Sequence, residues 1–121
     1  MQPNTIAWAS LLIGGWAVLN GIAHDAQILN EHKFKEDGYN RHLLYLLLSG
    51  HIIILSGLME MVAFWGLKEN QAWGFVVAGL ASLTFFIYCL MIWPFLKSVV
   101  TMVLQGGLFV VVVLNFPKPS V

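Results

Sequence analysis

Four long apolar segments alternate with shorter polar ones along the chain. A helix needs about 20 apolar residues to cross the roughly 30 Å hydrocarbon layer of a membrane, and a helix satisfies its own backbone groups there. The pattern therefore predicts an all-α protein, a bundle of four transmembrane helices. The expected spans are residues 5–23, 42–66, 73–93 and 94–115 of a single domain covering residues 1–121.

A long polar segment, residues 24–41, joins the first two expected spans. It holds seven of the twelve Lys, Arg, Asp and Glu residues of the chain. Apolar side chains at Ile28, Leu29 and Phe34 within it predict a short helix at the membrane interface, inside an otherwise polar loop. The later connections are short, so consecutive spans should run antiparallel.

Basic residues predict the orientation, because Lys and Arg are enriched in cytoplasmic loops. With four spans, the first and third connections lie on one side of the membrane, and the second connection lies on the other side with both termini. The first side carries Lys33, Lys35, Arg41 and Lys97, and the second carries Lys68 and Lys118. We therefore expect a protein of a bacterial inner membrane, with the long loop 24–41 in the cytoplasm and both termini outside.

Composition agrees with a membrane location and excludes several classes of function. Charged residues make up 10% of the chain, whereas soluble domains have about a quarter. The formal net charge of zero leaves no basic surface for nucleic acid. Cys89 is the single cysteine, which excludes an intramolecular disulfide and a dithiol mechanism.

The second expected span carries a polar stripe on one face. At 100° per residue its five members fall within about 60° of one another. They are His42, Tyr45, Ser49, Ser56 and Glu60. Polar groups are costly against lipid, so the stripe should face the interior of the bundle. Glu60 then needs a proton or a partner such as Ser10 or Ser82; the alternative is an interfacial side chain that reaches the membrane surface.

His51 lies on the opposite, apolar face of the same span. Three interpretations remain open. His51 forms a hydrogen bond to a neighbouring helix, where Gln105 lies at similar depth; or it contacts another subunit, helped by Gly50 and Gly57; or it binds haem or a pigment. His51 and Glu60 are the two ionisable residues that we expect inside the membrane, and both are candidate functional residues.

The best candidate binding site is a polar mouth at the span ends next to the long loop. Its expected members are Asn20, His24, Arg41, His42, Tyr45, Tyr88, Lys97 and Gln105, with Thr101 beside them. The competing interpretation is that these are the ordinary interfacial residues of helix ends.

Metal and haem sites are weaker hypotheses. Candidate metal ligands near the membrane surface are His24, Asp25, His32 and His42, without the short spacing of motifs such as HExxH. His51 has no second membrane-embedded histidine for a haem. The chain also lacks a GxSxG motif or a nucleophile beside a base, which argues against an enzyme. No cofactor is expected.

These observations favour a membrane protein that acts through association. It would be an accessory subunit of a membrane complex, or a homo-oligomer with a small hydrophobic ligand between its helices. Its partners are then the lipid bilayer and other membrane subunits or itself. One alternative is a small carrier or proton relay along the stripe from His42 to Glu60. Another is a haem- or metal-binding redox module that uses His24, His42 or His51.

Overall fold

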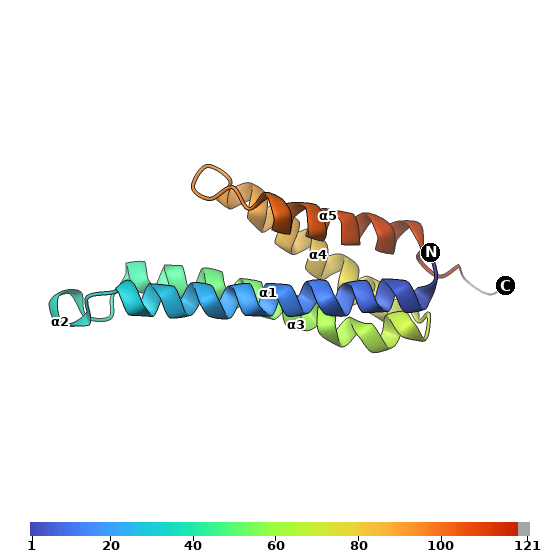
Figure 1. Cartoon of the computed structure of the whole chain (residues 1–121), viewed down its shortest axis with the longest axis horizontal. Helices are drawn as coiled ribbons and strands as arrows, with labels where there is room; N and C mark the ends of the chain where they lie inside the picture. Colours follow the sequence, from blue (N-terminus) through green and yellow to red (C-terminus); the bar gives the residue numbers. More distant parts are fainter. Residues whose placement is uncertain (119–121) are drawn as a thin grey trace.

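A computed structural model describes residues 1–118 as five helices, with no strand in that range. The helices are α1 (Pro3–Glu31), α2 (Phe34–Asp37), α3 (Arg41–Lys68), α4 (Ala72–Ile92) and α5 (Val99–Leu114). The all-α prediction is confirmed. Helices α1 and α3 lie side by side along the long axis of the molecule, with α2 at one end and the N-terminus at the other (Figure 1).

Glycines allow α1 and α3 to pack closely. A Cβ atom on Gly14 would lie 2.5 Å from the backbone oxygen of Gly57, and one on Gly57 would lie 2.6 Å from that of Gly14. Small residues permit such close approach between membrane helices. Gly57 therefore packs against α1 within the chain, and the contact of His51 with another subunit, one of its three interpretations, stays a prediction.

The segment after Ala23 is helical, which corrects the expected loop over residues 24–41. Helix α1 continues to Glu31, so the connection shrinks to residues 32–40 around α2. Residues 24–31 contain neither Gly nor Pro, and Nε2 of Gln27 donates to Oε1 of Glu31 at 3.1 Å, one turn further along the helix. Nothing in this stretch stops helix propagation.

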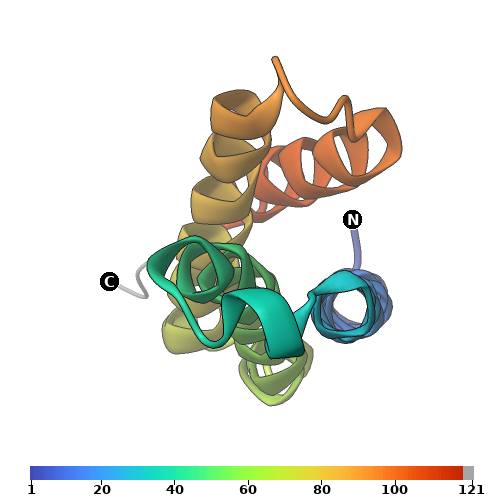
Figure 2. The same cartoon turned by 90° about the vertical axis from the view of Figure 1, so that its left-hand side faces the viewer.

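The core is thicker at one end of the bundle than at the other. Near the N-terminus it draws on α1, α3, α4 and α5, through Ile6, Ala7, Ala63, Leu67, Phe75, Ala78, Leu108 and Val112. Toward α2 it thins to a cluster of Ala17, Phe85 and Cys89. Helix α4 starts against α3 through Gly74 and Gly66. From there α4 and α5 diverge from the α1–α3 pair (Figures 1 and 2).

Helices α1, α3 and α4 are long and apolar enough to cross a membrane, which indicates an integral membrane protein. Helix α5 has 16 residues, about 24 Å at 1.5 Å per residue, and this is shorter than the roughly 30 Å hydrocarbon layer. The expected fourth span is interrupted because residues 93–98 form a turn and irregular chain around Pro94. Length and composition therefore identify three crossing helices, and α5 by itself is too short to be identified as a fourth.

Candidate functional site

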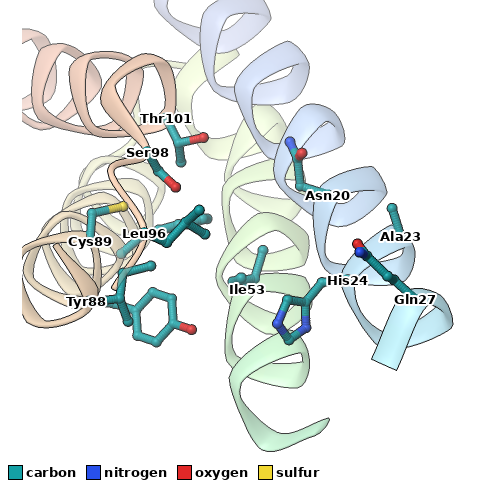
Figure 3. A pocket seen from close by; sticks show the side chains of 12 residues that line it. Asn20, Ala23, His24, Gln27, Ile53, Tyr88, Cys89, Leu96, Ser98 and Thr101 are labelled. Carbon is teal, nitrogen blue, oxygen red and sulfur yellow. The ribbon is translucent and has the colours of Figure 1, made fainter. Parts of the chain in front are cut away.

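A cavity of about 260 Å³ lies where α4 and α5 diverge from α1 and α3. Its wall comes from α1, α3, α4, the chain that leads into α5, and the first turn of α5. The cavity forms at the end where the core is thin, since the diverging helices no longer fill the space between them. Figure 3 shows side chains from these separate elements around one space.

Polar side chains form one part of the cavity wall. They are Asn20, His24, Gln27, Tyr88, Ser98 and Thr101. The Tyr88 hydroxyl points into the space toward His24 and Ile53 (Figure 3). Ser98 precedes α5 but makes no side-chain capping bond to it. Amide, hydroxyl and imidazole groups both donate and accept hydrogen bonds, so this wall suits a ligand with a polar, uncharged end.

Apolar side chains form the rest of the wall. They include Ile53 of α3, Phe85 and Ile92 of α4, and Leu96. The rings of Phe85 and Tyr88 meet edge to face, with centroids 6.3 Å apart, an arrangement that aromatic pairs favour. Among the described residues, no Lys, Arg, Asp or Glu side chain lines the cavity. The site is therefore amphipathic without being charged.

Next to the cavity, Asp25 of α1 lies between two histidines. Its Oδ2 atom is 3.1 Å from Nδ1 of His51 on α3, and its Oδ1 atom is 3.5 Å from Nδ1 of His24. The Nδ1 atom of His51 also lies 2.8 Å from the Leu47 carbonyl oxygen. Two acceptors around one ring nitrogen require that nitrogen to carry the proton.

Gly50 makes this contact between helices feasible. A Cβ atom at position 50 would overlap the Asp25 carboxylate, so a side chain there would displace it from His51. The His51 side chain is 69% exposed, and its partner on the neighbouring helix is Asp25 rather than the Gln105 suggested by the sequence. The sequence indicates Asp25 only as a candidate metal ligand, because the hydrophobic pattern places this residue in a loop.

Glu60 is completely buried, at 0% exposure, so the interpretation as a side chain that reaches the membrane surface is wrong. The two serines expected beside its carboxyl group bond elsewhere. Oγ of Ser10 donates to the backbone oxygen of Glu60 at 2.7 Å, and Oγ of Ser82 donates to that of Gly79 at 3.2 Å. The polar side chain next to the Glu60 carboxyl group is instead Gln105 of α5, which is 1% exposed.

The structure divides the expected polar mouth among several places. Asn20, His24 and Tyr88 line the cavity, as does Thr101. Gln105 lies in the interior beside Glu60. The remaining members, Arg41, His42, Tyr45 and Lys97, are exposed and do not line the cavity.

The polar stripe of α3 faces inward over only part of its length. Ser56 and Glu60 are buried, whereas His42 and Tyr45 are exposed. Near the N-terminus α1, α4 and α5 all pack around α3, whereas toward α2 the diverging helices α4 and α5 no longer cover it (Figure 1). The stripe from His42 to Glu60 therefore does not face the interior along its whole length, as the carrier alternative expects.

The four weak metal candidates do not come together. His32 places Nε2 2.6 Å from the Gly38 carbonyl oxygen, His42 is exposed at the start of α3, and His24 lies beside Asp25. Within residues 1–118, no group of three or more His, Cys, Asp or Glu side chains is placed to hold a metal ion. The geometry of the described residues gives the metal hypothesis no support.

Sequence reasoning missed Gln27 and Ser98 as cavity residues. Asn20, His24 and Gln27 recur at intervals of four and three residues, the spacing that places side chains on one helix face. That signal was visible, but it required α1 to continue past Ala23. Ser98 carries no such signal, because its position depends on the path of the chain between α4 and α5.

A scan against protein-family models finds no match for this chain, and searches of curated proteins and of solved structures also find none.

Proposed function

We propose that this protein is a four-span integral membrane protein that binds a small, uncharged amphipathic molecule in the cavity between its helices. The observation that carries this proposal is the cavity wall, where hydrogen-bonding groups of α1, α4 and α5 meet an apolar surface without any formally charged residue. Ligand sites in proteins have this character, mostly apolar with a few placed polar groups. Of the functions expected from the sequence, a ligand between helices is the one with a specific structural feature behind it.

The wall also limits the chemistry of the ligand. A charged head group would lose its hydration without gaining an opposite charge, which is costly in a membrane protein interior. Hydroxyl, carbonyl or amide groups would instead pair with Asn20, Tyr88 and Thr101. The volume of about 260 Å³ lies just below the roughly 300–1,000 Å³ common for ligand pockets. The ligand is therefore small, with one polar end and a compact apolar body.

The fourth span is part of this proposal, and two contacts support it. The N-terminal amine of Met1 donates to Oδ1 of Asn115, just after α5, at 3.2 Å. At the other end of α5, Thr101 shares the cavity with Asn20 of α1. Helix α5 therefore extends over the same depth of the bundle as the membrane-crossing part of α1. The residues that precede and follow α5 would complete the crossing to the two membrane surfaces.

We also propose that the α2 end lies in the cytoplasm, in a bacterial inner membrane. The charge distribution supports this orientation, because four of the six Lys and Arg residues lie toward α2 and basic residues favour the cytoplasmic side. The cavity, which lies at the same end of the bundle, would then receive its ligand near the cytoplasmic surface.

Native mass spectrometry of protein extracted gently from its own membrane tests the proposal. We expect a reproducible added mass from a small non-lipid molecule on the wild-type protein. Ser98→Trp should abolish that mass, because the indole would fill the cavity. Ser49→Trp is the matched control, since Ser49 bonds to the Tyr45 carbonyl oxygen on α3 away from the cavity, and it should retain the mass.

Two outcomes would contradict the proposal. One is a wild-type spectrum without any added small-molecule mass. The other is an added mass that survives Ser98→Trp while the variant elutes as a folded protein, because the molecule would then be bound elsewhere.

A further inference from the structure

Three buried oxygen atoms at the centre of the bundle have no hydrogen-bond donor. They are Oε1 and Oε2 of Glu60 and Oε1 of Gln105, none of which has a partner within residues 1–118. Both side chains are almost completely shielded, at 0% and 1% exposure. Buried polar groups are nearly always paired, and each exception requires an explanation.

The surroundings contain no cation that would balance an ionised Glu60. Its carboxylate forms no salt bridge among the described residues. Glu60 is packed against α1 through Gly14 and Ser10, and it lies beside Gln105 of α5. The membrane-crossing part of α1, residues 3–23, and all of α5 contain no titratable side chain.

The remaining titratable groups of the packed helices are distant along the bundle. In α4 they are Tyr88 and Cys89, which lie at the cavity. In α3 they are Arg41, His42, Tyr45 and His51 toward α2, and Lys68 at the opposite end of the helix. An isolated buried carboxylate is very unfavourable, and such a group takes up a proton instead.

We propose that Glu60 and Gln105 form a proton-binding site in the interior of the bundle. The neutral carboxyl group of Glu60 donates a hydrogen bond to Oε1 of Gln105. One proton thus supplies the donor that Oε1 of Gln105 lacks. Both residues lie away from the cavity lining, so the proton binds at a site separate from that of the ligand proposed there.

This bond would join two helices that otherwise share few contacts. Helix α3 packs mainly on α1 and α4, and α5 packs mainly on α4. Glu60 of α3 and Gln105 of α5 therefore bridge the interior directly. Loss of the proton would remove the bridge and leave a negative charge between the helices. The bound proton therefore keeps α5 in place. It thereby also keeps in place the part of the cavity wall that α5 contributes.

Infrared spectroscopy of the protein in lipid at neutral pH tests the site, because a protonated carboxyl group absorbs at a higher frequency than a carboxylate. We expect a band from a protonated carboxyl group in the wild-type protein, shifted by D₂O. Glu60→Gln should remove this band, and the amide should donate the same hydrogen bond, so the variant should fold. Glu69→Gln is the matched control at an exposed position and should leave the band unchanged.

Two further measurements make the assignment specific. Gln105→Leu should retain the band but move it to higher frequency, since the carboxyl group loses its acceptor. In wild-type protein with ¹³C-labelled glutamate, the band should move to lower frequency. Because Glu31, Glu36 and Glu69 are exposed, such a band belongs to Glu60 even if Glu60→Gln does not fold.

The proposal is wrong if the wild-type protein shows no protonated carboxyl band at neutral pH, or if the band persists in folded Glu60→Gln. A band that appears only when sodium and potassium are withdrawn would also overturn it, because the acceptors would then hold a monovalent cation rather than a proton.

Discussion

At the residue scale, the contact between Asp25 and His51 shows how a membrane helix can carry a histidine on an apolar face. The Nδ1–H group of His51 bonds to its own helix at Leu47 and lies within 3.1 Å of Asp25 on α1. A polar group near the hydrocarbon layer is favourable only with such partners. The contact therefore links α1 to α3 as well as satisfying the imidazole.

A double-mutant cycle measures this link. Asp25→Ala and His51→Ala should each destabilise the protein, and the double variant should be more stable than the sum of the single losses predicts. The expected coupling is about 1 kcal/mol, the size found for side-chain hydrogen bonds between membrane helices. Reversible unfolding in detergent micelles provides the free energies. Strictly additive losses would show that the two side chains do not interact.

At the element scale, the helices are arranged by the positions of small residues more than by polar ones. Gly14 and Gly57 bring α1 and α3 into backbone contact, and Gly66 and Gly74 do the same for α3 and α4. Membrane helices gain little from hydrophobic burial against one another, so close packing provides much of their attraction. The polar stripe of α3 is buried only at the end of the bundle where α1, α4 and α5 all pack around α3.

Replacing one of these glycines by alanine should therefore destabilise the fold more than the addition of a single methyl group suggests. In Gly57→Ala the new methyl group would lie 2.6 Å from the Gly14 carbonyl oxygen and 2.9 Å from the Val18 backbone nitrogen. Backbone atoms cannot move aside without shifting a helix, so we expect a loss of about 1–3 kcal/mol. Thermal unfolding in detergent compares this variant with the wild type.

Gly15→Ala is the matched control, because a Cβ atom there meets nothing within 4 Å. Alanine also favours helix over glycine, so this variant should be as stable as the wild type or more stable. Equal destabilisation by both changes would mean that helix contact at Gly57 does not limit stability.

The limits of α1 and α5 illustrate what hydrophobic pattern misses at this scale. The expected span 5–23 ended where hydrophobicity drops at His24, but α1 continues to Glu31 because helix formation depends on backbone propensity as well as on apolarity. The expected span 94–115 was largely apolar, but its first residues form a turn and irregular chain before α5 begins, because proline suits a turn as well as the first turn of a helix.

At the scale of the whole molecule, the bundle is a wedge. Four helices share a core near the N-terminus, and α4 and α5 diverge from α1 and α3 toward α2 (Figure 1). The cavity follows from this shape. The orientation of the wedge in the membrane would decide which compartment supplies the proposed ligand.

Labelling of single introduced cysteines with a membrane-impermeant maleimide tests that orientation. Asp37→Cys marks the α2 end and Glu69→Cys marks the opposite end, and both positions are exposed. In intact cells we expect Glu69→Cys to react and Asp37→Cys to react only after lysis. The native Cys89 is 1% exposed and should add little background. The reverse pattern would place α2 outside.

The candidate site could be predicted only in part. Asn20, His24 and Tyr88 were expected near one another because they lie at the same ends of their spans, and they line one cavity. Arg41, His42 and Tyr45 were expected there for the same reason, but they face away from it. Depth along the membrane follows from position in the sequence, whereas direction around the bundle depends on which helix packs on which face.

The sequence by itself therefore determined the helical class, the membrane location and the presence of ionisable groups within a spanning helix. Hydrophobicity and helix propensity are local properties, so the chain carries them without reference to a fold. Only the tertiary structure decided that Asp25 meets His51, that Gln105 lies beside Glu60, and that a cavity opens between diverging helices. These three features depend on how helices that are far apart in the sequence approach one another and on which faces they turn toward each other. Small residues and a few close backbone contacts control that arrangement.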